Sequence, residues 1–156
     1  MGGKRRTEVG TLSLREQKAW LGSLYPTYDC RASTILVCRG VVRPWELTCK
    51  HRFRIEYRLG HPPKTFVEEP KLQGREPDQR IPHTYSDEEV CLFRPFTHEW
   101  HPSKPLALTV VPWLMQWLVF YEVWFCTGEW HGAGEEPAPA VMQRHAEREE
   151  DQSKGT

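Results

Sequence analysis

The residues best suited to chemistry lie in one stretch, residues 81–102, which reads IPHTYSDEEVCLFRPFTHEWHP. Its only cysteine, Cys91, borders a short apolar patch, eight positions after His83 and nine before Trp100. The thiolate of a cysteine is a strong nucleophile, and loops interrupted by proline on both sides can present hydrogen-bond donors to it. We therefore predict that Cys91 is a nucleophile and that His83 assists it.

Each of these residues also has a plainer interpretation. A cysteine is often just a small buried residue. That interpretation fits the other four cysteines, because they lie in or beside predicted strands or end an apolar helix: Cys30, Cys38, Cys49 and Cys126. His83 could donate a hydrogen bond to an oxyanion, act as a base, or only brace its loop. Tyr85 and Asp87 could orient His83 or shape an acceptor site, whereas Ser86-Asp87 is also typical of a turn.

The composition limits the classes of function. A chain of 156 residues suits one domain, and its 21 basic and 21 acidic residues give no net charge, so it does not resemble a nucleic-acid-binding protein. Five cysteines with no C-x-x-C pair and no secretory signal indicate thiols in a reducing compartment, and so a cytoplasmic protein. A zinc site is the alternative, because Cys49 and His51 are close to Cys38 in sequence, but the spacing of the remaining residues does not supply the two close pairs of ligands that such a site needs. We expect neither a metal nor a cofactor.

A helix is predicted near the start of the chain. Apolar residues recur at helical spacing over residues 12–25, with Gln17 among the polar residues of the opposite face, and Pro26 helps to end the helix. Residues 1–10 are glycine-rich and basic, and we expect them to be disordered.

Three strands are predicted next. Residues 34–38 are β-branched and apolar, and Arg39-Gly40 is expected to begin a turn. Residues 45–57 alternate between apolar and polar, and residues 64–68 form a third short strand after a Pro-Pro turn. Successive strands joined by short turns form an antiparallel meander, so the fold class is α+β.

An apolar helix is predicted from Pro112 to about Cys126. It is apolar around most of its circumference, so we interpret it as a core helix. Alternatively, part of it is a docking surface made by its tryptophans, Trp113, Trp117 and Trp124. The 17-residue apolar run Val110–Cys126 contains Gln116 and Glu122 and is shorter than a typical membrane span, so no membrane association is expected.

We expect a folded domain at residues 11–132. Residues 133–156 are charged, contain prolines and lack large apolar side chains, so they are predicted to be a disordered tail.

The order of these elements and four short motifs resemble the ubiquitin-conjugating enzyme family. His61-Pro62-Pro63-Lys64 resembles the family's proline turn, and Pro82-His83 resembles the end of its His-Pro-Asn tripeptide. Cys91-Leu92 has the family's spacing from that tripeptide, and Trp100-His101-Pro102 resembles the Trp-x-Pro that follows. The sequences at 82–87, 91–93, 99–102 and 127–130 are similar to the bacterial branch of the family, which is encoded beside cGAS-like nucleotidyltransferases in antiphage cyclic-oligonucleotide signalling (CBASS) operons.

This resemblance implies a ubiquitin-conjugating fold over roughly residues 12–130 and a thioester between Cys91 and the C-terminal glycine of the synthase, or of a ubiquitin-like protein. Some of these operons encode no separate activating enzyme, so whether one takes part stays open. His83 replaces the usual asparagine, and the chain contains no asparagine at all. Trp100 is a further supporting residue that the resemblance indicates.

Two rival functions stay open at this stage. The first is a catalytically inactive scaffold that binds the synthase through its tryptophan-rich helix. The second is a thiol hydrolase that pairs Cys91 with His83 or His98, although no hydrolase motif accompanies these residues.

Overall fold

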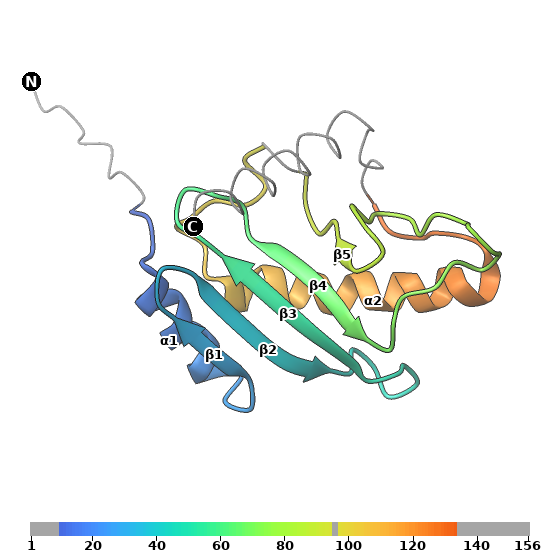
Figure 1. Cartoon of the computed structure of the whole chain (residues 1–156). Coiled ribbons are helices and arrows are strands. Elements are labelled where there is room, and N and C mark those ends of the chain that lie inside the picture. Colours follow the sequence, from blue (N-terminus) through green and yellow to red (C-terminus); the bar gives the residue numbers. More distant parts are fainter. Residues whose placement is uncertain (1–9, 95–96, 134–156) are drawn as a thin grey trace, which may run out of the picture.

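A computed structural model describes residues 10–94 and 97–133 (Figure 1). The predicted disorder of the two ends therefore falls almost entirely outside the described residues, and the domain limits stay predictions. The helices and strands, in chain order, are α1 (Leu14–Leu24), β1 (Asp29–Ala32), β2 (Leu36–Val42), β3 (His51–Tyr57), β4 (Lys64–Glu69), β5 (Glu89–Val90), the 3-10 turn η1 (Leu106–Leu108) and α2 (Val110–Thr127). The α+β class is as predicted.

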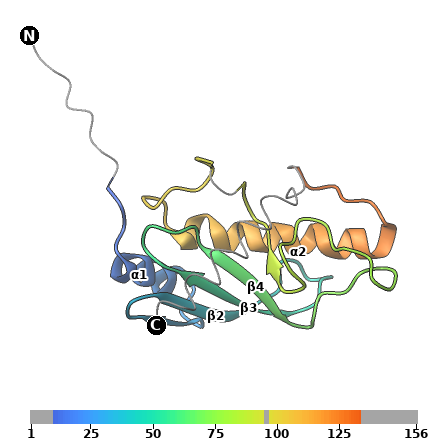
Figure 2. The same ribbon diagram turned by 45° about the horizontal axis from the view of Figure 1, so that its top comes forward.

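The strands form one antiparallel sheet in the order β1-β2-β3-β4-β5. Helix α2 runs along one face of this sheet, and α1 lies at its β1 end (Figures 1 and 2). The alternation predicted for the middle strand is confirmed in β3, where Phe53, Ile55 and Tyr57 are all buried. This architecture is compatible with an E2-like fold.

The first predicted strand is longer than its sequence indicates. β2 runs through Arg39-Gly40 to Val42, so the turn predicted there is wrong. Glycine fits at position 40 of this strand because a side chain there would collide with the ring of Tyr28. The short edge strand β1 was not predicted at all, since it has only four residues and three of them are exposed.

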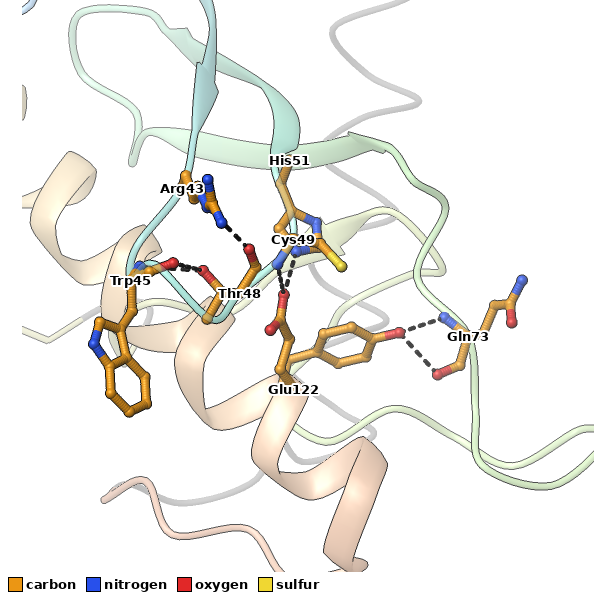
Figure 3. Close-up of polar contacts among 8 residues, drawn as sticks. Arg43, Trp45, Thr48, Cys49, His51, Gln73 and Glu122 are labelled. Atoms are coloured by element: carbon orange, nitrogen blue, oxygen red, sulfur yellow. Dashed lines mark hydrogen bonds and ion pairs between the residues drawn. The ribbon is translucent and has the colours of Figure 1, made fainter.

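Residues 45–50 form a loop instead of the start of β3, which corrects the second predicted strand. Trp45 and Leu47 are 59% and 81% exposed, so the alternating pattern there does not mark a buried face. Side chains hold the loop from within: Arg43 Nε donates to the Thr48 carbonyl at 3.2 Å, and Thr48 Oγ1 donates to the Trp45 carbonyl (Figure 3).

The same loop is tied to α2 by one carboxylate. Oε1 of Glu122 accepts the Cys49 backbone N–H at 2.9 Å and lies 2.9 Å from Nε2 of His51 (Figure 3). His51 is only 2% exposed. This one carboxylate of α2 therefore holds both the end of the loop and the first residue of β3.

Gln17 is fully buried, although its sequence position suggested the polar face of the first helix. Its side-chain amide donates to the Lys104 carbonyl at 3.1 Å and accepts the Leu106 N–H at 2.8 Å. Burial of an amide is tolerated when its hydrogen bonds are made. Gln17 thus attaches α1 to the segment that leads into α2.

Helix α2 is a core element. By length and composition the stretch Leu106–Thr127 could cross a membrane, as core helices often could. However, Trp117 and Trp124 are each 4% exposed, and Glu122 pairs with the sheet. The predicted docking surface is therefore wrong for these two tryptophans. Trp113 is half-buried, with its ring centroid 5.9 Å from that of Phe93.

The cysteines differ from the sequence expectation in two ways. Cys30 and Cys38 lie directly opposite each other on β1 and β2 and form a disulfide, so the prediction of five thiols is wrong for this pair. Cys49 and Cys126 are thiols, but both are exposed and neither is a small core residue. The reason is that Cys49 lies in the loop before β3 and Cys126 in the last turn of α2.

Candidate active site

The backbone around Cys91 is fixed by strand pairing on both sides. β5 pairs with β4 along one edge, and along its other edge Thr84 pairs with Val90. The Cys91 N–H donates to the His83 carbonyl at 2.8 Å, and the Tyr85 N–H donates to the Glu89 carbonyl at 2.8 Å. The predicted nucleophile and its predicted assistant are thus directly opposite each other on a short antiparallel ladder.

The sulfur of Cys91 is half-buried and close to two oxygens. Sγ lies 3.2 Å from the Tyr85 hydroxyl oxygen and 3.3 Å from the Phe93 carbonyl oxygen. As a neutral thiol it can donate to either oxygen. As a thiolate it can only accept, and then the Tyr85 hydroxyl is the group that can donate to it.

Tyr85 stays protonated over the whole physiological range. Burial is the main cause that raises its pKa, and the Cys91 sulfur and the negative charge of Glu89 raise it further. A hydroxyl that keeps its proton remains a hydrogen-bond donor. The structure therefore brings together the predicted residues Cys91, His83 and Tyr85.

A hollow adjoins the thiol, because Tyr85 and Phe93, which both contact the sulfur, also form part of its wall. The residues that line it are Pro62, Pro63, Thr65, Tyr85, Glu89, Val90, Leu92 and Phe93. Most of these are apolar, and the Pro-Pro turn before β4 closes one side.

His83 is 7% exposed and has a left-handed backbone, with φ of 52°. Its carbonyl accepts the Trp117 indole N–H at 3.2 Å in addition to the Cys91 N–H. Its imidazole packs against the indole of Trp130, with 5.0 Å between ring centroids and an angle of 33° between the ring planes. Trp130 is far from His83 in the sequence. The two residues meet because the chain reverses at Gly128, whose φ is 84°, and returns over the site.

Two predicted supporting residues have other roles. Trp100 is buried and packs edge-on against Tyr57, with 5.2 Å between centroids, so it supports the core beneath the cysteine loop. Asp87 is exposed in a turn in which Ser86 Oγ accepts the Glu89 N–H at 3.1 Å, as the turn interpretation predicts. The hydrogen bond and charge of Glu88 raise the pKa of Lys71, and the charge of Asp87 adds to this. His98, the alternative partner of a hydrolase dyad, is exposed.

Two residues of the site were missed by sequence reasoning. Glu89 is 4% exposed and lines the hollow, although it follows two other acidic residues, Asp87 and Glu88. Trp130 was noticed only as part of a motif. The usable signal for Glu89 is its spacing: residues two apart in a strand share a face, so Glu89 shares the face of Cys91.

This arrangement, an α+β domain with a cysteine in a hydrogen-bonded loop between the sheet and an apolar helix, is compatible with an E2-like (ubiquitin-conjugating-type) protein. The family model described as Type II CBASS E2 protein matches residues 17–137, which is more than half of the chain and includes the whole site. The chain belongs to this family. Comparison with curated proteins gave no match.

Proposed function

We propose that this chain is a ubiquitin-conjugating-type acyl transferase in which Cys91 forms a thioester with the C-terminal glycine of a cGAS-like nucleotidyltransferase, or of a ubiquitin-like partner. The observation that carries the proposal is the half-buried Cys91 sulfur, 3.2 Å from the Tyr85 hydroxyl at the end of a paired strand. Family membership supports an E2-type role within CBASS.

The reaction needs little from the protein beyond geometry and hydrogen-bond donors. The Cys91 thiolate attacks the carbonyl carbon of an activated glycine, and the activating group leaves. A thioester keeps that carbon reactive, so an amine can then displace the sulfur. His83 is placed opposite Cys91, where its imidazole would donate to the oxyanion of the tetrahedral intermediate.

The structure weakens both rival functions. An inactive scaffold that docks through the tryptophan helix would need Trp117 and Trp124 on the surface, and they are buried. A hydrolase dyad would need a water-accessible base beside the thiol, whereas the His83 ring is covered by Trp130. Acyl transfer to an amine needs no such base for water and fits the covered histidine better.

The test is intact-mass analysis of the protein co-expressed with the nucleotidyltransferase of its operon, with and without a thiol reductant. The wild type is expected to carry a partner-sized adduct that the reductant removes. Cys91→Ser is expected to carry the same adduct as a reductant-stable ester, and Cys91→Ala none.

The matched control is Cys49→Ser, which removes an exposed thiol outside the site. This variant is expected to form the adduct as the wild type does. An undiminished adduct on Cys91→Ala, or its loss in Cys49→Ser alone, would refute the assignment of Cys91.

A further inference from the structure

Trp130 forms the outer cover of the His83 side chain. The centroids of the indole and the imidazole are 5.0 Å apart, and the indole also packs against Trp117 and Phe120, with 5.7 and 5.9 Å between centroids. His83 is 7% exposed whereas Trp130 is half-buried, so the indole lies at the surface and the imidazole beneath it. Little of the imidazole is therefore open to water.

The segment after α2 holds the indole closely in this place. The chain reverses at Gly128 and brings Trp130 and Gly132 back toward the helix. A Cβ atom at position 132 would lie 2.6 Å from Nε1 of Trp130 and 2.8 Å from Cδ2 of Phe120. These distances leave no room for a side chain, so Gly132 is part of what keeps the indole over His83.

Stability alone does not explain a tryptophan at position 130. Its Nε1 atom is buried and has no hydrogen-bond partner among the residues that the structure describes. A buried donor without a partner costs about 1–3 kcal/mol. A phenylalanine would avoid this cost but has a smaller ring. The size of the indole is therefore better explained by the histidine that it covers.

An uncovered histidine at this place would endanger a thioester on Cys91. The Cys91 N–H donates to the His83 carbonyl at 2.8 Å, so the two residues are opposite each other. An imidazole can take a proton from water, and a histidine that assists a cysteine is a common arrangement in enzymes that form acyl intermediates. Water activated in this way would hydrolyse the acyl-enzyme before an amine arrives.

We propose that Trp130 is a positioning residue that directs the Cys91 thioester toward amines by keeping water away from the His83 imidazole; this rests on the proposed function of Cys91. In the reaction that the cover prevents, water gives one proton to the imidazole and its oxygen attacks the thioester carbonyl carbon. The C–O bond forms and the C–S bond breaks. The sulfur takes the proton back from the imidazolium, which leaves a free carboxylic acid and the Cys91 thiol.

The test measures hydrolysis of the acyl-enzyme when no amine is present, in chains that lack the exposed thiols Cys49 and Cys126. A synthetic peptide that ends in a glycine thioester acylates Cys91 by thiol exchange. The excess peptide is removed, and intact mass then follows the loss of the acyl group. Trp130→Ala is expected to load at the wild-type rate, which shows that the site is formed. It should then lose the acyl group about 10-fold faster, which is part of the 100-fold or more, roughly, that a positioned base can contribute.

Three further variants show whether the effect depends on His83. Trp130→Phe keeps a ring over the imidazole and should hydrolyse much more slowly than Trp130→Ala. Gly132→Ala displaces the indole without removing it and should hydrolyse faster than the wild type. His83→Asn retains a residue that accepts the left-handed backbone but removes the base, so its combination with Trp130→Ala should restore slow hydrolysis.

Trp45→Ala is the matched control, because Trp45 is a tryptophan that is 59% exposed in the loop before β3, and it should hydrolyse at the wild-type rate. Two results would overturn the proposal: wild-type hydrolysis in Trp130→Ala, or fast hydrolysis that persists when His83→Asn is added to it. A wild-type chain that the peptide thioester never acylates at Cys91 would instead overturn the proposed function, and this outcome is read in the loading step, before hydrolysis is followed.

Discussion

Replacing Glu122 by alanine is expected to destabilise the protein by about 2 kcal/mol, because it leaves a buried histidine without its partner. Nε2 of His51 would lose its 2.9 Å contact, and the side chain is 2% exposed, so water cannot replace the lost acceptor. An unsatisfied buried polar group costs about 1–3 kcal/mol. The Cys49 amide, which shares the same oxygen, lies in an exposed loop and can bond to water, so it adds little.

The control variant is Glu122→Gln. A single oxygen, Oε1, receives both contacts in the structure, and glutamine retains a carbonyl oxygen at that place. This variant is expected to lose less than about half of what alanine loses, since both hydrogen bonds can still form. Urea denaturation gives the free energies of unfolding, and a loss of about 2 kcal/mol corresponds to a melting temperature about 4–8 °C lower for a chain of this size.

The reasoning fails if Glu122→Ala unfolds within about 0.5 kcal/mol of the wild type, the range of an ordinary surface substitution. It also fails if glutamine is as destabilising as alanine. The second result would mean that the charge of Glu122, and not its role as an acceptor, holds the loop of residues 43–50 to α2.

Substitutions in three further parts of the chain test the local geometry. Gly128→Ala is expected to lower the free energy of unfolding by more than about 1 kcal/mol, because φ is 84° and the new methyl group meets the Arg75 guanidinium. Gly22→Ala in α1 has nothing within 4 Å of the new methyl group and is expected to raise the free energy of unfolding by up to about 1 kcal/mol. Urea denaturation of both variants is the measurement, and a loss of stability in both would contradict this prediction. Tyr85→Phe should slow the alkylation of Cys91 by iodoacetamide at neutral pH about fivefold to tenfold, since the thiolate loses a hydrogen-bond donor worth about 1–1.4 kcal/mol. The reaction is measured in a chain that also lacks Cys49 and Cys126. An unchanged rate would show that Tyr85 does not act on the thiolate. Ser13→Ala removes the cap of α1 and is expected to cost about 1 kcal/mol. The hydrogen bond from the Ser13 backbone N–H lowers the pKa of Glu16 below 4.5. The wild type should therefore lose the contribution of Glu16 to the free energy of unfolding as the pH falls below that value, and Glu16→Ala should show no such loss. Denaturation at pH 7 and at pH 4 gives the comparison.

The parts of the fold that depend on local periodicity could be predicted from the sequence. Helix α1, the buried side of β3, strand β4 and helix α2 all have apolar residues at the expected spacing, and α2 ends at Thr127, one residue beyond the predicted end. Periodicity failed at residues 45–50, where the same alternation occurs in a loop. The side chains of Arg43 and Thr48 hold that loop through bonds that no periodic pattern reveals.

The parts that depend on distant partners could not be predicted. Gln17 is polar and belongs to an amphipathic helix, yet it is buried because two backbone groups near Lys104 satisfy its amide. Trp130 approaches His83 only because the chain turns back after α2. The candidate site was predicted in its central residues, Cys91 and His83, whereas its buried acid was not, since a run of acidic residues normally indicates a solvated surface.

The backbone of His83 gives a physical reason for the residue that departs from the family pattern. Its φ of 52° lies in the left-handed region, which glycine, asparagine, aspartate and histidine enter more readily than other residues. The loop needs that conformation, because it turns the His83 carbonyl toward two donors, the Cys91 amide and the Trp117 indole. Asparagine and histidine thus share the ability to shape this loop, while they differ in the group they bring to it. Exchange between them is therefore expected to preserve the backbone that holds Cys91 while it changes the side chain at position 83, so the shape of the loop and its chemistry can vary independently.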